Sequence, residues 1–433
     1  MLYVDKYSFK LFMYFVIVKI SMEYYYYSYY VGLDYPIYVV DLNIWKYIYG
    51  SVWVTILFFG IRHSFRIPST FLMQFFYMMQ VIPMTVIFAF QNESWIFYTT
   101  VCVSVLAGEI ILARCKFKYV YSLELSHIWW TGIAVFGILI LFLFVVRLNG
   151  LPTTKALDFD AVYDLRSSGF FKSNQYTSYL LSVVSKCLLP LVLAYSLWKR
   201  KYLPALIAVI LESVLYLYTG MKEFLFVGPM VVIVTLWGKR DWFYKGIWYL
   251  ASVGLAFLSF GWRLGNLVYY TGSLLVRRCM LLPAIISFKY YDYFRTNPRV
   301  GLSGIYPRWL VPSLHNEYLA KDYSYIISDL YFHEPQMQSN NGIFGEACAR
   351  FGLWGILLEV ILMILIFMMV DVLMSKTSYA FALGASVFFA YGMINAHLID
   401  QLLCGYWAAL IVFYLFYNHQ HLETTCVVYE KTD

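Results

Sequence analysis

Charged side chains are scarce in this sequence. Asp, Glu, Lys and Arg together make up 13% of the 433 residues, whereas hydrophobic residues make up 61%. A soluble domain cannot have this balance, because too few polar side chains would remain to cover its surface. Apart from one central loop, no polar stretch exceeds about 30 residues, which is too short to bury a core of its own. The composition therefore predicts one integral membrane domain over residues 1–433, with no separate soluble domain.

Cysteine pairs and nucleotide-binding signatures are also missing. The cysteines are scattered, with no CxxC pair and no histidine at metal-ligand spacing, which argues against a disulfide framework and a zinc site. The sequence contains no nucleophile elbow, no P-loop and no glycine-rich dinucleotide fingerprint. We therefore expect no metal and no cofactor, and nothing in the sequence indicates binding to nucleic acid.

Long apolar runs, by contrast, recur along the whole chain at the length needed to cross a bilayer. They predict an all-α polytopic membrane protein with about twelve transmembrane helices. The expected spans lie at about 9–31, 46–61, 69–90, 96–113, 128–147, 176–198, 202–220, 224–238, 246–262, 343–373, 379–398 and 402–417.

Every second link between these spans carries basic residues, which predicts that these links and both termini lie in the cytoplasm. The links between them would lie outside, and two are long: 148–175 and the large outer loop 263–342. A loop as long as 263–342 is exempt from the orientation rule, so its excess of basic residues calls for another explanation. The two halves of the chain show no internal repeat, which argues against an inverted-repeat transporter.

The large outer loop has two recognisable parts. The first half of 268–294 is expected to form a helix that lies in the membrane interface and ends near Pro283. The segment 304–318 is punctuated by proline and is expected to line a cavity or to contact protein. Tyrosine and tryptophan are common at every membrane interface, so the aromatic residues of this loop do not by themselves indicate a site.

The two other outer links offer one basic candidate each. In the first long loop, Arg166 is placed to fork onto a phosphate or diphosphate at headgroup depth, or else to pair with Asp160 or Asp164. In the tight turn 218–226, Lys222 either pairs with Glu223 or faces a diphosphate. Four ionisable residues also fall inside the expected spans, but at no common depth that would predict a proton relay. They are Glu109, Lys186, Glu212 and Glu359.

The stretch 340–360 begins with polar residues and continues as a membrane helix. Glu346 and Arg350 are four residues apart, so they lie on one helix face and are expected to pair. Gly345, Ala349 and Gly352 form a stripe of small residues that would let the helix pack closely on a neighbour. The sequence thus predicts a paired helix entry next to the large basic loop.

Four short stretches resemble the Wzy family of bacterial O-antigen and capsule polymerases. NNGIFGEACARFGLWGIL (340–357) resembles the entry of that family's late outer loop into a span, and YPRWLVPSLHNEY (306–318) resembles its proline-bounded outer loop. VYDLRSSGFF (162–171) resembles the arginine-bearing first long outer loop. YTGMKEFLF (218–226) falls where the family often has a Gly-Arg turn, with a lysine here in place of the arginine. The resemblance implies a GT-C-like polymerase or ligase architecture.

The resemblance also implies a function. The chain would be a metal-independent glycosyltransferase, a polysaccharide polymerase of the bacterial cytoplasmic (inner) membrane that builds capsule or the O-antigen of lipopolysaccharide. It would join oligosaccharide repeat units carried on undecaprenyl diphosphate, by inverting transfer on the outer face of the membrane. Besides the lipid bilayer, a chain-length regulator and a flippase are the expected partners.

Cationic side chains at the headgroup plane would stabilise the diphosphate leaving group of this reaction. The candidates for binding diphosphate or sugar are Lys222, Arg263, Arg278, Arg308 and Arg350. The catalytic candidates are Arg166, for charge stabilisation, and His315, His333 and Glu346, as alternative bases for the acceptor hydroxyl.

Three other functions remain open. A flippase for lipid-linked oligosaccharides has a similar number of spans but little need of the long outer loop, and an O-antigen ligase has a similar plan with a different acceptor. A sensor or scaffold would have no use for a basic loop that forms a cavity. Loss of the gene separates these alternatives, because single repeat units still reach the surface without a polymerase, but not without a flippase or a ligase.

Overall fold

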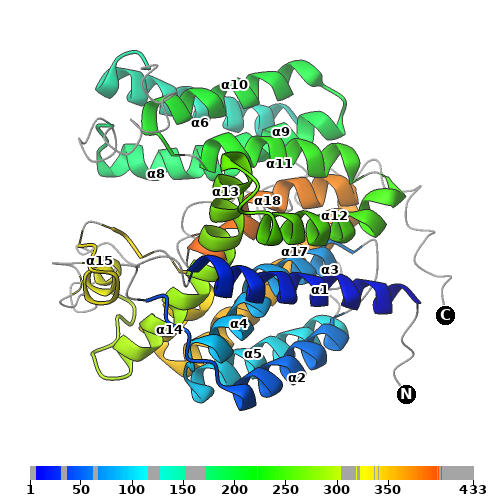
Figure 1. Cartoon of the computed structure of the whole chain (residues 1–433). Coiled ribbons are helices and arrows are strands. Elements are labelled where there is room, and N and C mark those ends of the chain that lie inside the picture. The colour runs from blue at the N-terminus through cyan, green and yellow to red at the C-terminus, as the bar shows by residue number, and fades with distance from the viewer. Residues whose placement is uncertain are drawn as a thin grey trace. The chain divides into compact units, whose positions relative to one another are not determined.

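The computed structural model describes most of the chain (Figure 1). The described residues are 6–30, 37–61, 67–115, 127–152, 171–221, 223–238, 240–303, 318, 322–335, 337–339, 341–396, 398 and 401. Within these ranges every regular element longer than a single turn is a helix. The chain divides into two compact units, which are described separately. Unit 1 comprises Met1–Lys116, Asp241–Met368 and Ala390–Asp400, and unit 2 comprises Phe117–Arg240, Met369–Phe389 and Gln401–Asp433.

Unit 1 is built around the pair of α1 and α12, which lie side by side and run in the same direction (Figure 1). Tyr14 packs on Tyr249 near the middle of the pair, and Tyr24 packs on Phe260 near its end, with ring centroids 5.5 and 4.5 Å apart. The elements of unit 1 are α1 (Lys6–Tyr25), η1 (Tyr26–Tyr30), α2 (Ile44–Gly60), α3 (Pro68–Phe76), η2 (Tyr77–Val81), α4 (Ile82–Phe90), α5 (Trp95–Arg114), α12 (Asp241–Phe260), α13 (Asn266–Gly272), η5 (Ser273–Leu281), α14 (Leu282–Phe294), α15 (Tyr323–Ile327), η8 (Ser328–Phe332) and α16 (Ile343–Phe351). Helix α4 packs on α1, and α13 follows and contacts α12, whereas α2 packs on α4 and α5, and α14 on α16.

Unit 2 is a group of helices in which α9 packs against both α10 and α11 (Figure 1). Its elements are α6 (His127–Asn149), α8 (Gln175–Val183), η4 (Val184–Leu188), α9 (Leu189–Trp198), α10 (Tyr202–Thr219) and α11 (Glu223–Trp237). Two further helices, α17 (Leu353–Lys376) and α18 (Tyr379–Asn395), each contribute residues to both units. Helix starts follow local capping, because Asn43, Ser94 and Asn174 each accept a hydrogen bond from a first-turn backbone N–H.

Seven helices in the described part of the chain are long and apolar enough to cross a membrane. They are 68–90, 95–114, 132–149, 176–198, 202–219, 266–294 and 353–374. Shorter apolar helices lie at 44–60, 227–237, 246–260 and 379–395. The protein is therefore all-helical with membrane-spanning character, and most residues of the predicted runs are helical where they are described. The expected span at 402–417 lies outside the described residues.

Three long helices pass through a proline without ending, and in each the proline follows a widened π-helical turn. Pro83 follows η2, Pro190 follows η4 and Pro283 follows η5, each with one residue between, so that the proline is the second residue of the next α-helical segment. Proline lacks an N–H and its ring clashes with the carbonyl four residues earlier in an ordinary α-helix. The wider turn accommodates one extra residue, so that Leu282 N–H donates to the Arg277 carbonyl five residues back.

A helix is present where the interfacial helix was predicted, but the prediction that it ends near Pro283 is wrong, and its position in the membrane interface stays a prediction. The helix runs without a break from Asn266 to Phe294, because the π-helical turn before Pro283 relieves the clash. Its contacts place it across the ends of other helices. Tyr269 packs on Tyr29 at the end of η1, and Lys289 pairs with Glu93 in the link between α4 and α5. In Figure 1, α13 and α14 accordingly run across the direction of α1 and α12.

The prediction of a single helix over 343–373 is also wrong, because the structure breaks it at Gly352. This residue has φ +68°, a conformation that only glycine adopts readily. The guanidinium group of Arg299 occupies the space that a side chain at this position would need. The break leaves α16 as a short helix of nine residues ahead of α17, and α16 carries both Glu346 and Arg350.

Candidate functional site

The chain segments around Tyr30 gather at one end of unit 1, which we call the Tyr30 end. It holds the end of α1 and η1, the segment before α2, the link between α4 and α5, and the residues after α12. Two backbone hydrogen bonds join the segment before α2 to the end of α4. Asp41 N–H donates to the Phe90 carbonyl (2.8 Å), and Asn43 N–H donates to the Ala89 carbonyl (3.0 Å). Trp262 Nε1 donates to Ser28 Oγ (3.2 Å) and so ties the end of α12 to η1.

Four tyrosines surround one arginine at this end. We call Tyr25, Tyr29, Tyr30, Tyr38 and Arg277 the Tyr–Arg cluster. Tyr25 stacks on Tyr29 with centroids 4.7 Å apart, and Tyr30 meets Tyr38 edge to face at 4.2 Å. A hydrogen bond joins the side chains of Tyr38 and Arg277, and Tyr30 Oη donates to the Arg277 carbonyl (3.3 Å). Helices from distant parts of the chain therefore hold Arg277 in place.

Neutral groups surround the charge of Arg277. Its Nε donates to Ser273 Oγ (3.0 Å), and the arginine forms no ion pair with a carboxylate among the residues that the structure describes. Burial raises the pKa of Tyr38, against the opposing effect of Arg277, so this hydroxyl stays neutral at pH 7. A half-buried guanidinium with neutral neighbours retains its attraction for an anion such as a phosphate. Sequence reasoning missed this residue and selected its neighbour Arg278.

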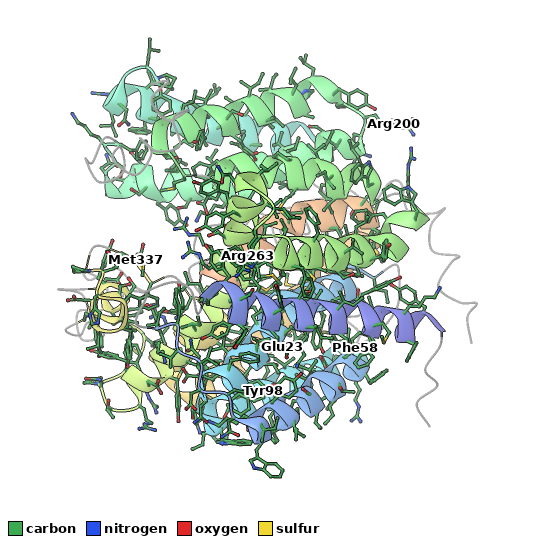
Figure 2. The ribbon with its side chains drawn as sticks, viewed as in Figure 1. Glu23, Phe58, Tyr98, Arg200, Arg263 and Met337 are labelled. Carbon is green, nitrogen blue, oxygen red and sulfur yellow. The ribbon has the colours of Figure 1, made fainter. Side chains whose placement is uncertain are left out.

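Two of the predicted arginines flank the Tyr–Arg cluster. Arg263 is exposed just past the end of α12, and its guanidinium lies over the Trp262 ring, 4.7 Å from the centroid (Figure 2). Trp262 in turn meets Tyr29 edge to face at 5.4 Å. Arg278 is exposed on η5, and its charge lowers the pKa of Tyr38. Arg277 and Arg278 therefore both act on Tyr38, and Arg263 is connected to the cluster through Trp262.

Glu346 and Arg350 form the predicted ion pair, and both side chains are buried. Arg350 Nε donates to Glu346 Oε1 (3.0 Å), and its Nη1 donates to the carbonyls of Gly301 (3.1 Å) and Ser303 (3.0 Å). Tyr323 donates its hydroxyl to Glu346. Burial and then the charge of Glu346 raise the pKa of Tyr323, so its hydroxyl remains a donor. The pair therefore anchors the turn after α14 to α16.

The start of α16 fits closely against α14, as the stripe of small residues predicts. A side chain at Gly345 would meet the Ser287 backbone at 3.0 Å and the amide of Asn341. A side chain at Gly342 would meet Gln80 at 2.8 Å and the Met393 carbonyl at 3.0 Å. Tyr290 on α14 reaches back to donate to the Ser339 carbonyl (3.0 Å). These contacts position the helix that carries the buried ion pair.

A second ion pair links the helix Asn266–Phe294, which we call the crossing helix, to the Tyr30 end. Lys289 Nζ lies 2.7 Å from Glu93 Oε1, and the exposed fractions of the two side chains are 17% and 7%. Burial raises the pKa of Glu93, while the charge of Lys289 opposes that shift. Lys46 donates to the backbone carbonyls of Asn92 and Glu93 and so holds the same link from α2.

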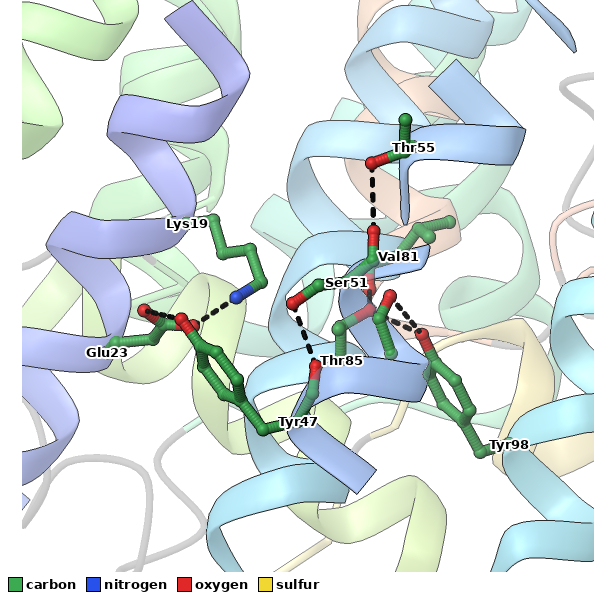
Figure 3. Close-up of polar contacts among 9 residues, drawn as sticks. Lys19, Glu23, Tyr47, Ser51, Thr55, Val81, Thr85 and Tyr98 are labelled. Carbon is green, nitrogen blue, oxygen red and sulfur yellow. Dashed lines mark hydrogen bonds and ion pairs between the residues drawn. The ribbon is translucent and has the colours of Figure 1, made fainter. Parts of the chain in front are cut away.

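The contact between α1 and α2 contains a third ion pair, which sequence reasoning did not select. Lys19 and Glu23 pair along α1, Lys19 Nζ lies 4.2 Å from the centroid of the Tyr47 ring, and Tyr47 Oη donates to Glu23 (3.4 Å; Figure 3). On the far side of α2, Thr85 and Tyr98 share a hydrogen bond of 2.8 Å (Figure 3). The sequence signal for the Lys19–Glu23 pair was its spacing of four residues inside an expected span.

The remaining predicted residues lie elsewhere. His333 is exposed and ends η8 in a left-handed conformation with φ +56°. Glu223 faces Lys186 across unit 2 at 3.5 Å. Arg166, Lys222, Arg308 and His315 lie outside the described residues. Within the described ranges, no three or more His, Cys, Asp or Glu side chains gather in a way that would hold a metal ion.

No protein-family model matches this chain, and neither the curated proteins nor the solved structures contain a match to it. The proposed function therefore depends on the residues themselves and on the resemblance of the four short stretches.

Proposed function

We propose that this chain is a polysaccharide polymerase that transfers a growing glycan from its lipid diphosphate to the sugar of an incoming lipid-linked repeat unit. The observation that carries the proposal is the Tyr–Arg cluster, in which a half-buried arginine has tyrosines rather than carboxylates as its neighbours. Arg278 also acts on Tyr38, and Arg263 lies over Trp262, which contacts Tyr29 of the cluster. A diphosphate with an attached sugar matches this combination of charge and aromatic surface.

The proposed site faces the outer surface of the bacterial cytoplasmic membrane, in line with the positions of the basic links. The crossing helix Asn266–Phe294 would lie at the depth of the lipid headgroups, where a lipid-linked diphosphate presents its charge. The three arginines would bind this group and stabilise the negative charge that develops as the glycosidic bond to it breaks. A role of Arg166, Lys222 and Arg308 in this transfer stays a prediction, because all three lie outside the described residues.

Glu346 and Arg350 are proposed to act mainly by position. Arg350 holds the turn at Gly301 and Ser303, which leads into the proline-bounded segment 304–318. Glu346 orients Arg350 and receives the hydroxyl of Tyr323. His315, His333 and Glu346 stay alternative candidates for the base that accepts the proton of the attacking sugar hydroxyl.

A deletion strain tests the polymerase against its two rivals. Without the chain, we expect single repeat units to reach the surface and long polymer to be lost, as seen on a gel of surface glycans. Complementation with the native chain should restore the polymer, and complementation with Arg277→Lys should not. Loss of all surface-attached repeat units would instead favour a flippase or a ligase and would contradict the proposal.

A further inference from the structure

Glu109 on α5 lies with its carboxyl group against the end of α2. The side chain is 3% exposed, and neither carboxyl oxygen has a hydrogen-bond partner among the residues that the structure describes. One oxygen occupies the space that a side chain at Gly60 would need, so only glycine permits this contact. The carboxyl therefore lies against the end of the neighbouring helix, and none of the basic side chains that the structure describes forms an ion pair with it.

Unit 2 repeats the same arrangement with different helices. Glu212 on α10 is 3% exposed, and both of its carboxyl oxygens also lack a hydrogen-bond partner in the described part of the chain. One oxygen occupies the space that a side chain at Gly228 of α11 would need. Two buried acids, one in each unit, thus face a glycine of the adjacent helix.

Both glycines lie where a helix leaves backbone carbonyl groups without their own amide donors. α2 ends at Gly60, so the carbonyls of Phe59 and Gly60 receive no hydrogen bond from within that helix. Gly228 precedes Pro229, which has no N–H to donate to the Leu225 carbonyl. A carboxylate beside such oxygens would be repelled, whereas a protonated carboxyl has an O–H to donate to them.

An ionised carboxylate without a partner is also costly in an apolar interior, and this cost favours the neutral acid. The ionisable groups that the structure describes near Glu109 do not change this conclusion. Tyr77 on η2 donates its hydroxyl to the Val54 carbonyl (2.6 Å), and Cys102 lies on α5 itself. On α17, Val360 packs against Gly108, and the adjacent ionisable residue is the acid Glu359. None of these three groups brings a positive charge.

We propose that Glu109 and Glu212 are proton-binding sites. Each carboxyl holds a proton at neutral pH and donates it to a backbone carbonyl of the neighbouring helix that has no amide donor within that helix. The bound proton fastens α5 to the end of α2 in unit 1, and α10 to the proline turn of α11 in unit 2. This inference does not depend on the proposed function.

Infrared difference spectra of the purified protein in nanodiscs at neutral pH test the proposal. The spectrum of the native chain minus that of Glu109→Gln should contain the C=O stretching band of one protonated carboxyl group, and the Glu212→Gln difference should contain another. Glu334→Gln is the control, because Glu334 is exposed and should give carboxylate bands. Carboxylate bands in the Glu109 and Glu212 differences, without a protonated band, would overturn the proposal.

Thermal unfolding separates the donated hydrogen bond from the mere absence of charge. Glutamine keeps an N–H donor of similar size, so Glu109→Gln should leave the unfolding midpoint close to that of the native chain. Methionine has a similar volume and no donor, so Glu109→Met should lower the midpoint. A Met variant as stable as the Gln variant, or more so, would contradict the donation of the proton to the helix end. The same comparison at Glu212 provides an independent repeat in the other unit.

Discussion

Replacing Arg350 with methionine is expected to lower the free energy of unfolding by about 3–5 kcal/mol, the usual cost of breaking a buried ion pair from one side. The exposed fractions of the Arg350 and Glu346 side chains are only 5% and 4%. The substitution would leave the Glu346 carboxylate buried without the charge of Arg350, while the Tyr323 hydroxyl still donates to it. It would also remove the donor from the carbonyls of Gly301 and Ser303.

A double variant separates the two contributions to this loss of unfolding free energy, which are the unpaired charge of Glu346 and the lost hydrogen bonds to the two carbonyls. Glu346→Gln combined with Arg350→Met removes both charges, so we expect it to be more stable than Arg350→Met alone, because no buried charge is left without its partner. Arg295 is exposed directly after α14, and Arg295→Met is the matched control, with an expected change within about 0.5 kcal/mol.

The assay is equilibrium unfolding in mixed micelles, in which a denaturing detergent is titrated and tryptophan fluorescence reports the folded fraction. A midpoint for Arg350→Met equal to that of the Arg295→Met control would refute the anchoring role of the pair. Full stability together with a loss of glycan transfer would instead indicate that Arg350 contacts substrate directly.

Three further predictions concern other parts of unit 1. Arg277→Lys should reduce glycan transfer by about 100-fold or more in a purified assay, because a lysine ammonium lacks the forked donors of a guanidinium. Gly352→Ala should lower the free energy of unfolding by about 1–3 kcal/mol, because its conformation suits only glycine, whereas Gly254→Ala, with open space around it, should have a small effect. Glu93→Gln should flatten the dependence of stability on pH, measured by unfolding midpoints from about pH 4 to about pH 7.

The sign of the Glu93 effect follows from its raised pKa. The folded protein holds the proton of this carboxyl more tightly than the unfolded chain does. The stability that Glu93 contributes is therefore complete below the ordinary carboxyl pKa and is lost as the pH rises through the raised value. Midpoints of the native chain that rise relative to those of Glu93→Gln over this pH range would contradict the assignment. For Arg277→Lys, unchanged transfer would be the contradicting result, and for Gly352→Ala, an unchanged midpoint.

The apolar runs predicted the helices well, because length and hydropathy are local properties of the sequence. The pairing of Glu346 with Arg350 was equally accessible, since a spacing of four residues determines it. The continuation of the helix through Pro283 could not be predicted, because it depends on a π-helical turn that a proline in the sequence does not reveal. The break at Gly352 was missed for a related reason, since glycine also packs inside membrane helices, as Gly345 does here.

The Tyr–Arg cluster is a clearer example of an arrangement that the sequence alone does not predict. Tyr30 and Arg277 are 247 residues apart in the chain and meet only because the crossing helix lies over the end of η1. The sequence presents Arg277 and Arg278 as equivalent neighbours, whereas the fold half-buries the first and exposes the second. A consistent helical register from Gly272 through Val276 to Met280, all of which are buried, would have indicated which arginine lies nearer the packed face.

The most direct test of the proposed function is polymer formation by the purified chain in nanodiscs, supplied with lipid-diphosphate repeat units in the presence of EDTA. We predict a ladder of increasing repeat number on a gel, lost with Arg277→Lys and retained with Arg295→Gln. Repeat units that stay single with the folded native chain, or a full ladder with Arg277→Lys, would contradict the account.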